Sequence, residues 1–297
     1  MHSISPYLIK TYDRNLAGPH DEKYCSLDKI RGNNLIDVVD QFTAIFIDTF
    51  SKVEEGEKKS FKFSDINRTD TEIYGYMQFG VYGNASEIHN ISSGEKVYDK
   101  KVDESDINKF FFYFKILPGS RAGFFFSQNI HGNGIKSEFS KKFNEFYKNK
   151  TKGLNLQFNP FSSKNLLKDW YENANVKEIK INEFSAGHVK EIADQLHESF
   201  AEVTFKPTKR NSFFGKLSEV KGKSDIITIL SQYGKKVSAV AELNGKKRTF
   251  SLSSEGEPLS AIEIDEVVDI IDGNPTFDSM ETEVRKISEE FQGELDF

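Results

Sequence analysis

The sequence predicts a mixed α+β protein in which antiparallel sheets carry packed amphipathic helices, in two domains. Short segments rich in aromatic and β-branched residues are separated by Gly, Asn and Ser, and longer segments repeat apolar residues at helical spacing. The chain has 297 residues, of which 27 are phenylalanine. This length suits two domains, because domains usually run about 100–200 residues, and buried aromatic rings supply large cores.

The first hundred residues are expected to supply strands around one helix. Residues 35–50 repeat apolar side chains such as Leu35, Val39 and Phe42 at intervals of three and four, which predicts a helix. Strands of an antiparallel sheet are expected at residues 7–12, 61–66, 72–82 and 96–102.

The strongest local pattern is the segment KFFFYFKILPGSRAGFFFSQNI at residues 109–130. Its two apolar runs flank a Pro-Gly-Ser-Arg sequence, which predicts two buried strands joined by a turn. Residues 135–147 then place Phe139, Phe143 and Tyr147 on one face, with Lys141 on the opposite face. This spacing predicts an amphipathic helix that packs on the sheet.

The second half of the chain continues with strands and helices of the same kind. A domain boundary is expected near Asn159-Pro160, which gives domains of residues 1–160 and 161–297. Asn244-Gly245 suits a type I′ turn, so residues 237–252 are predicted to form a hairpin. Further strands are expected at residues 154–161, 176–184 and 200–206, and helices at residues 162–174, 186–197 and 278–295, the last with Asp278 as its cap.

The expected location is the cytoplasm. No apolar run approaches the ~20 residues that span a bilayer, and the first residues lack the pattern of a signal peptide. The single cysteine, Cys25, excludes an intramolecular disulfide framework and agrees with a reducing compartment.

The net charge of −6 hides an asymmetry between the body of the chain and its end. Residues 255–297 contain fourteen acidic and two basic residues, which leaves the preceding residues with a net charge of +6. Such asymmetry can indicate nucleic-acid contact in one part and partner contact or screening in the other. Two ordinary solvated surfaces explain the same count equally well.

Clustered basic residues in the second half are the main functional signal. They interleave with phenylalanines and could bind a phosphate backbone, which gives affinity without sequence choice. The alternative is a solvated loop whose phenylalanines belong to the core. The predicted nucleic-acid-binding residues are Lys206, Lys209, Arg210, Lys216, Lys221, Lys223, Lys246, Lys247 and Arg248.

The acidic end has two interpretations. Its carboxylates can lie over the basic surface and compete with phosphates for the same lysines, which would restrain nucleic-acid binding until a partner displaces them. Alternatively, residues 261–271, with Ile262, Ile264 and Val268, form a packed element whose acids face water.

A Mg²⁺-dependent nuclease is the alternative enzyme hypothesis. Glu178 and Lys180 lie on a predicted strand with Asp169 upstream, which imitates the Asp…Glu-x-Lys arrangement that binds Mg²⁺. Glu-x-Lys also arises by chance in a chain that is 29% charged. The HGNG sequence at residues 131–134 lacks the spacing of a phosphate-binding loop, and the six histidines form no zinc pattern, so neither a metal nor a cofactor is expected.

Three stretches of the chain are FFFYFKILPGSRAGFFFSQNIHGNGIKSEFSKKFNEF, AEVTFKP and VSAVAELNGKKRTFSLSSEGEPLSAIEI. In the order and pattern of these elements, from about residue 72 to the C-terminus, the chain resembles the RexA-like phage-exclusion family and related bacterial antiviral defence proteins. The resemblance implies a cytoplasmic, homodimeric DNA-binding sensor that acts with a separate effector, such as a membrane protein. The family offers no catalytic motif to carry over.

The sequence therefore predicts a non-specific nucleic-acid-binding component of a bacterial antiphage defence system, with DNA, a second copy of the chain and a separate effector as partners. The alternatives are the nuclease of a defence system and a protein-interaction module that acts through the acidic C-terminal segment.

Overall fold

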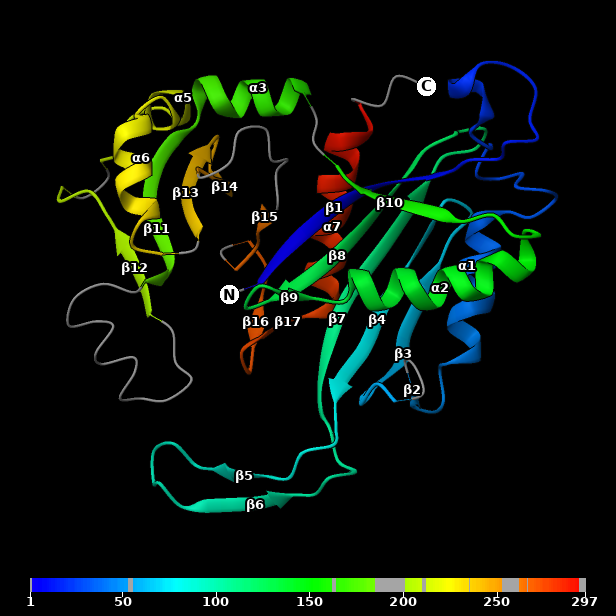
Figure 1. Ribbon diagram of the computed structural model, residues 1–297, viewed down its shortest axis with the longest axis horizontal. Coiled ribbons are helices and arrows are strands. Elements are labelled where there is room, and N and C mark those ends of the chain that lie inside the picture. The colour runs from blue at the N-terminus through cyan, green and yellow to red at the C-terminus, as the bar shows by residue number, and fades with distance from the viewer. Residues whose placement is uncertain are drawn as a thin grey trace.

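The computed structural model describes residues 2–52, 56–161, 164–184, 201–209, 212–234, 236–252, 262–265 and 267–293. Several antiparallel sheets with packed helices make up these residues, which confirms the predicted α+β class (Figure 1). The predicted helix at residues 186–197 lies outside the described residues. Among the described residues, no helix is both long and apolar enough to cross a lipid bilayer.

One large antiparallel sheet organises the molecule. Its strand order is β10-β1-β8-β7-β4-β3-β2, with β15 added beside β1 and β9 beside β8. The central strands come from the phenylalanine-rich segment, where residues 109–130 form two strands as predicted. The bounds are β1 His2–Thr11, β2 Ser51–Lys52, β3 Lys59–Arg68, β4 Glu72–Val81, β7 Asp106–Ile116, β8 Gly123–Ile130, β9 Asn133–Gly134, β10 Leu156–Pro160 and β15 Ile262–Glu263.

Both faces of the central strands are apolar, because successive side chains of a strand point to opposite faces. On β7, Phe112 and Phe114 join one buried cluster, whereas Phe111 and Tyr113 join a second cluster on the other face. All four side chains are completely buried. The sheet therefore needs a covering layer on each side.

Helices α1 (Leu35–Ile45) and α2 (Lys136–Lys150) cover the first face (Figure 1). The ring of Phe42 on α1 lies 5.3 Å from that of Phe143 on α2 and 5.4 Å from that of Phe63 on β3. Helix α1 ends at Ile45, earlier than the predicted residue 50, because Phe46 leaves helical geometry.

The C-terminal helix α7 (Phe277–Gln292) covers the second face. Its buried residues include Met280, Val284 and Phe291, and the Phe291 ring stacks 6.1 Å from that of Phe126 on β8. Its N-cap is Thr276 rather than the predicted Asp278. Strand β15 also returns to this sheet, since Ile262 pairs with Ile4 of β1.

The described residues between β10 and β15 form a second unit, called the insertion here. A four-stranded sheet of order β12-β11-β13-β14 packs against its helices around Trp170, Val176 and Ala239. The predicted hairpin is β13-β14, with positive φ at Asn244 and Gly245 as a type I′ turn requires. The bounds are α3 Lys164–Asn173, β11 Asn175–Phe184, β12 Ala201–Phe205, α5 Leu217–Lys221, α6 Ser224–Ser231, β13 Lys236–Leu243 and β14 Lys246–Ser251.

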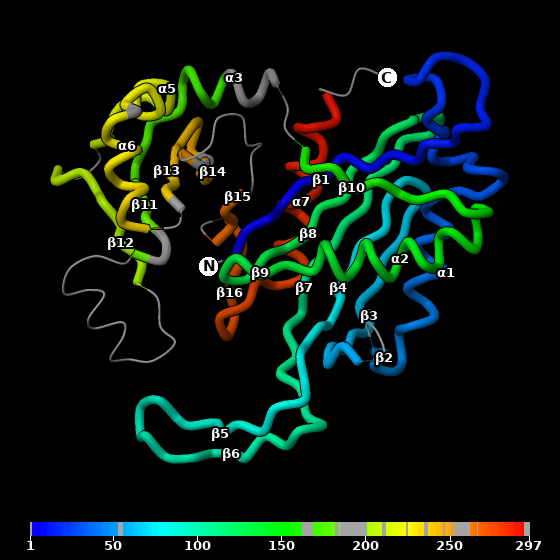
Figure 2. Tube along the Cα trace, viewed as in Figure 1, coloured from blue at the N-terminus to red at the C-terminus, as the bar shows by residue number. Residues whose placement is uncertain are grey.

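The chain leaves the large sheet after β10, forms the insertion, and then returns to the large sheet with β15 and α7 (Figure 2). The division into domains of residues 1–160 and 161–297 stays a prediction. Together with α7, Ile262, Ile264 and Val268 cover the apolar second face.

A separate hairpin, β5 (Ser86–His89) and β6 (Lys96–Lys100), extends away from the large sheet (Figure 1). The predicted strand at residues 96–102 thus lies in a two-stranded sheet of its own rather than in the main one. The smallest sheet pairs β16 (Ile270–Ile271) with β17 (Asn274–Pro275), just before α7.

A buried carboxylate adds a polar link between α7 and the sheet. Glu72 on β4 accepts hydrogen bonds from Lys115 on β7 and, at 2.8 Å, from Arg285 on α7. Burial opposes ionisation of Glu72, but the bond from Lys115 and the positive charges outweigh it and lower the pKa of the carboxyl.

Replacing Phe291 by Ala should lower the free energy of unfolding by about 3 to 5 kcal/mol, because the ring is buried among Phe124, Phe126 and Phe161. Urea denaturation measures the change. The matched control is Glu289→Ala on the exposed side of the same helix, expected within about 0.5 kcal/mol of wild type. Equal effects of the two substitutions would contradict the docking of α7.

Glu72→Gln should cost about 3 kcal/mol at neutral pH, because it breaks a buried ion pair. A carboxyl with a lowered folded-state pKa contributes stability above its unfolded pKa of about 4.3, and that contribution is lost as the pH falls through the folded-state pKa. The difference between wild type and variant should therefore stay constant from pH 7 down to about pH 5 and shrink as the pH falls below about 4.3. A difference independent of pH in urea unfolding would show that Glu72 is not an ionised partner.

Candidate nucleic-acid interface

The nine predicted nucleic-acid-binding residues do not form one surface. Arg210 and the side chain of Lys246 lie outside the described residues. Lys206 pairs with Glu178 at 2.8 Å, and Lys216 donates to the carbonyl oxygen of Asn173 at 2.7 Å. These two ammonium groups already have partners, although the Lys206 side chain stays 66% exposed.

Three predicted lysines are available at the surface of the insertion. Lys209 follows β12, and Lys221 and Lys223 lie at the junction of α5 and α6. None of the three makes an ion pair with a residue that the structure describes. Lys247 on β14 is half-buried and has contacts within the protein. The usable part of the predicted cluster is therefore these three lysines, of which Lys209 and Lys223 are exposed and Lys221 is half-buried.

Arg248 is not at the surface, which corrects the prediction for this residue. Its side chain is 1% exposed, and its guanidinium lies 4.8 Å from the ring centre of Trp170 and 5.5 Å from that of Phe291. Nη2 of Arg248 also donates a hydrogen bond to Oε1 of Glu290 on α7, at 3.4 Å. Arg248 thus joins the insertion to α7 through cation–π contacts and an ion pair, and it cannot reach a phosphate.

The described part of the acidic C-terminal segment is packed against the large sheet. Ile262, Ile264 and Val268 are buried, as expected for a packed element. Some of its carboxylates also meet groups of the insertion, because Glu263 lies 3.9 Å from Lys180 and accepts a hydrogen bond from Thr249 at 2.6 Å. These contacts lie at the junction of the two units, away from the exposed lysines named above.

The nuclease residues do not assemble into a site. Glu178 pairs with Lys206, Lys180 lies near Glu263, and Asp169 accepts a bond from Asn173 within its own helix. Across the described ranges, no three His, Cys, Asp or Glu side chains gather in a way that could hold a metal ion. The geometry of the described residues offers no support for Mg²⁺-dependent cleavage.

The HGNG sequence forms a turn between β8 and α2. His131 and Gly132 have positive φ values of 50° and 82°, and β9 pairs back onto β8 before the helix starts at Lys136. The two residues turn the chain sharply between neighbouring elements.

A second basic site lies at the end of the large sheet and was missed by the sequence analysis. A cleft of about 430 Å³, called the sheet-end cleft here, opens between the chain after β1 and the loop after α2. Its cations are Arg14, Arg31 and Lys152. Clustering along the sequence could not reveal it, because Arg14 and Lys152 are far apart in the chain.

Arg31 is held firmly within the sheet-end cleft. It binds Asp13 through Nε and Nη2, both at 2.8 Å, and donates from Nη1 to the carbonyl oxygens of Thr151 and Lys152. The hydrogen bond from Arg31 holds the pKa of Asp13 below its usual range, although burial opposes this. Asp13 is 4% exposed, so this pair sets one fixed wall of the cleft.

Arg14 and Lys152 supply the available charge. Within the described residues neither side chain has an ion-pair partner, and both are exposed. Lys152 adopts a left-handed backbone with φ of 53°, as does Arg31 with φ of 48°. Such a conformation costs a non-glycine residue about 1 kcal/mol, and the two bonds from Arg31 to the 151–152 carbonyls help to hold it.

Tyr12 adds an aromatic surface to the same cleft. Its ring stacks with that of His20 at 5.0 Å and meets that of Tyr24 edge-on at 5.5 Å. Lys10 lies over the Tyr24 ring at 5.2 Å. Basic and aromatic groups therefore occur together here, as they do where proteins bind nucleic-acid strands.

No family model matches the chain, and no curated protein matches it. The resemblance to the phage-exclusion family therefore stays a prediction.

Arg248→Met should lower the free energy of unfolding by about 2 kcal/mol, because it removes the cation from between two aromatic rings and leaves Glu290 without this partner. Thermal and urea denaturation measure the loss. The exposed control Lys209→Met should be neutral in stability. A stable Arg248→Met variant that binds DNA less tightly would show that Arg248 belongs to the nucleic-acid interface after all.

Proposed function

We propose that the protein binds the phosphate backbone of nucleic acid without sequence preference. The observation that carries the proposal is the pair Arg14 and Lys152, which line one cleft beside the fixed Arg31 and form no close ion pair with a described residue. Such cations bind a phosphate with the largest net gain in free energy, because no internal ion pair has to break first.

The expected affinity is electrostatic in origin. Each phosphate contact releases a condensed counterion, so affinity falls as salt rises, with little dependence on base sequence. The ring of Tyr12 provides a stacking surface for an exposed base, which favours single strands or strand ends at this site.

The exposed lysines of the insertion are the second contact that we propose. They lie at the opposite end of the molecule from the sheet-end cleft, so a short duplex contacts one site or the other (Figure 2). Separate variants of the two sites can therefore assign the binding to its source.

The biological setting is also a proposal. We place this binding in bacterial defence against phage, as a sensor that acts as a homo-oligomer with a separate effector, because the element pattern from about residue 72 onward resembles the RexA-like family. That resemblance is the only support for the setting, whereas the proposal of phosphate binding rests on the cations of the cleft.

The variant Arg14→Gln/Lys152→Gln should bind DNA more weakly for all sequences alike. Removing two phosphate contacts should make the slope of log affinity against log salt shallower by roughly 1.8. Fluorescence anisotropy with two unrelated duplexes of about 20 base pairs, from about 50 to 200 mM salt, measures both effects.

The matched control is Lys96→Gln/Lys141→Gln, which removes the same charge from lysines already paired with Asp99 and Glu57. It should retain the wild-type slope. If Lys209→Gln/Lys221→Gln/Lys223→Gln abolishes binding while the cleft variant binds normally, the insertion is the interface and the sheet-end cleft is not.

A further inference from the structure

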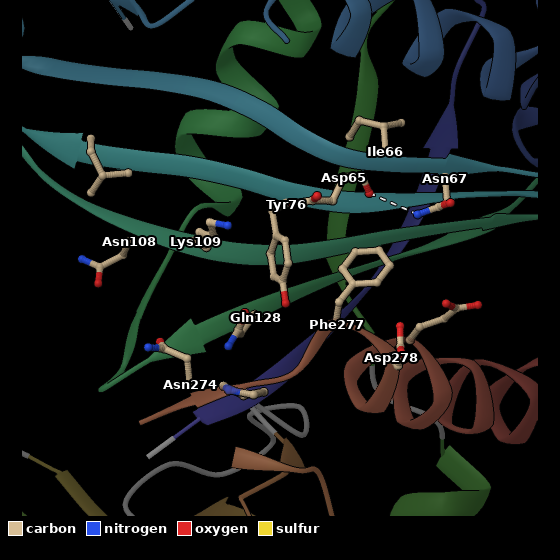
Figure 3. Close-up of a pocket in the computed structure, with 13 residues that line it drawn as sticks. Asp65, Ile66, Asn67, Tyr76, Asn108, Lys109, Gln128, Asn274, Phe277 and Asp278 are labelled. Atoms are coloured by element: carbon tan, nitrogen blue, oxygen red, sulfur yellow. Dashed lines mark hydrogen bonds between the residues drawn. The ribbon is translucent and has the colours of Figure 1, made fainter. Parts of the chain in front are cut away.

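A larger cleft lies on the other side of the large sheet, well separated from the cations discussed above. It measures about 950 Å³ and opens between the exposed ends of β3, β4 and β7 and the start of α7 (Figure 3). This volume lies in the upper part of the range for small-molecule sites. The residues that matter for its chemistry are Asp65, Tyr76, Lys109, Phe277, Asp278 and Glu281.

Tyr76 on β4 points its hydroxyl into this cleft (Figure 3). The residue is 8% exposed, and its hydroxyl has no hydrogen-bond partner among the described residues. The hydroxyl oxygen is not one of the fully buried polar atoms that lack a partner, so it is open to the cleft although most of the side chain is buried. The hydroxyl is therefore available to a bound molecule.

Two carboxylates near this hydroxyl are also available. Asp65 reaches the cleft from β3, and Asp278 from α7, so that they come from opposite walls (Figure 3). Neither side chain makes an ion pair or hydrogen bond with a described residue. Burial raises the pKa of Tyr76 to about 12, and the negative charges of Asp65 and Asp278 contribute, which places both carboxylates within electrostatic reach of the phenol.

The backbone directs Asp65 into this position. The pairing of β3 with β4 shifts register between Ser64 and Asn67, and Asp65 has a positive φ of 55° within that bulge. Bulges of this kind re-aim a side chain relative to the regular strand. The amide of Asn67 donates to the carbonyl oxygen of Asp65 at 3.2 Å and stabilises the irregular backbone.

The charge balance of the cleft favours a cation. Three carboxylates line it against one lysine, and Glu281 is already engaged by Tyr74 at 2.8 Å and Arg285 at 3.1 Å. Lys109 lies over the Tyr76 ring, 5.7 Å from its centre. The rings of Tyr76 and Phe277, 5.3 Å apart, add an aromatic wall that attracts cations.

An organic cation fits better than a metal ion. Among the described residues, no three potential ligands come close enough together to hold a metal. Carboxylates on opposite walls, with a hydroxyl between aromatic rings, suit an elongated molecule with separated positive groups.

We propose that this cleft binds a small organic cation with primary ammonium groups, such as a linear polyamine, through Asp65, Asp278 and the hydroxyl of Tyr76. One ammonium group donates to Asp278 and a second donates to Asp65, and Tyr76 accepts a hydrogen bond from the bound amine. The methylene chain lies against Phe277. The cleft and the nucleic-acid interface involve different residues, so either can exist without the other.

Isothermal titration calorimetry of the full chain with spermidine tests the proposal. Wild type should bind spermidine at low salt, and Asp65→Asn and Asp278→Asn should each weaken binding about tenfold, because each removes one charge-assisted hydrogen bond. Tyr76→Phe should also weaken binding while it retains the wild-type thermal stability, since its hydroxyl has no partner to lose among the described residues.

Glu289→Gln is the matched control, because it removes one negative charge from an exposed position on α7 outside the cleft. It should bind spermidine as wild type does. The neutral diol 1,8-octanediol should not bind. Absence of spermidine binding to wild type, or equal weakening by Glu289→Gln and the cleft variants, would overturn the proposal.

Discussion

The alternation of aromatic side chains on β7 and β8 is the constraint on which the rest of the structure depends. Phe112 and Phe125 enter one core, whereas Phe111 and Phe124 enter another, so both faces of the sheet must be covered. Helices α1 and α2 cover the first face. The second face is covered by α7, which comes from the C-terminal part of the chain.

The position of α7 on the sheet determines two other features. With α7 on the sheet, Glu290 and Phe291 meet Arg248, which fixes the insertion beside the core. The start of α7 meanwhile faces the ends of β3 and β4 and closes the cleft around Tyr76. The acidic composition of the C-terminal segment follows in part from this role, since Glu281 and Glu290 bind Arg285 and Arg248.

Local patterns predicted the local structure well. Apolar spacing identified α1 and α2, the FFFYF and FFF runs identified β7 and β8, and Asn244-Gly245 identified the β13-β14 turn. Such local patterns could not predict contacts between segments that are distant in the sequence. Arg248 looked like part of a basic hairpin because nothing local indicates that Trp170 and Phe291 enclose it, and Arg14 and Lys152 share a cleft only through the fold.

Because both faces of the sheet are covered, the sheet and α7 should unfold as one cooperative unit. Native-state hydrogen exchange at the amides of α7, β7 and β8 of the full chain measures this cooperativity. The slowest amides of α7 and of β8 should exchange with the same free energy of opening, equal to that of global unfolding. Exchange of the buried α7 amides around Val284 and Ile287 through a separate opening of much lower free energy would contradict it.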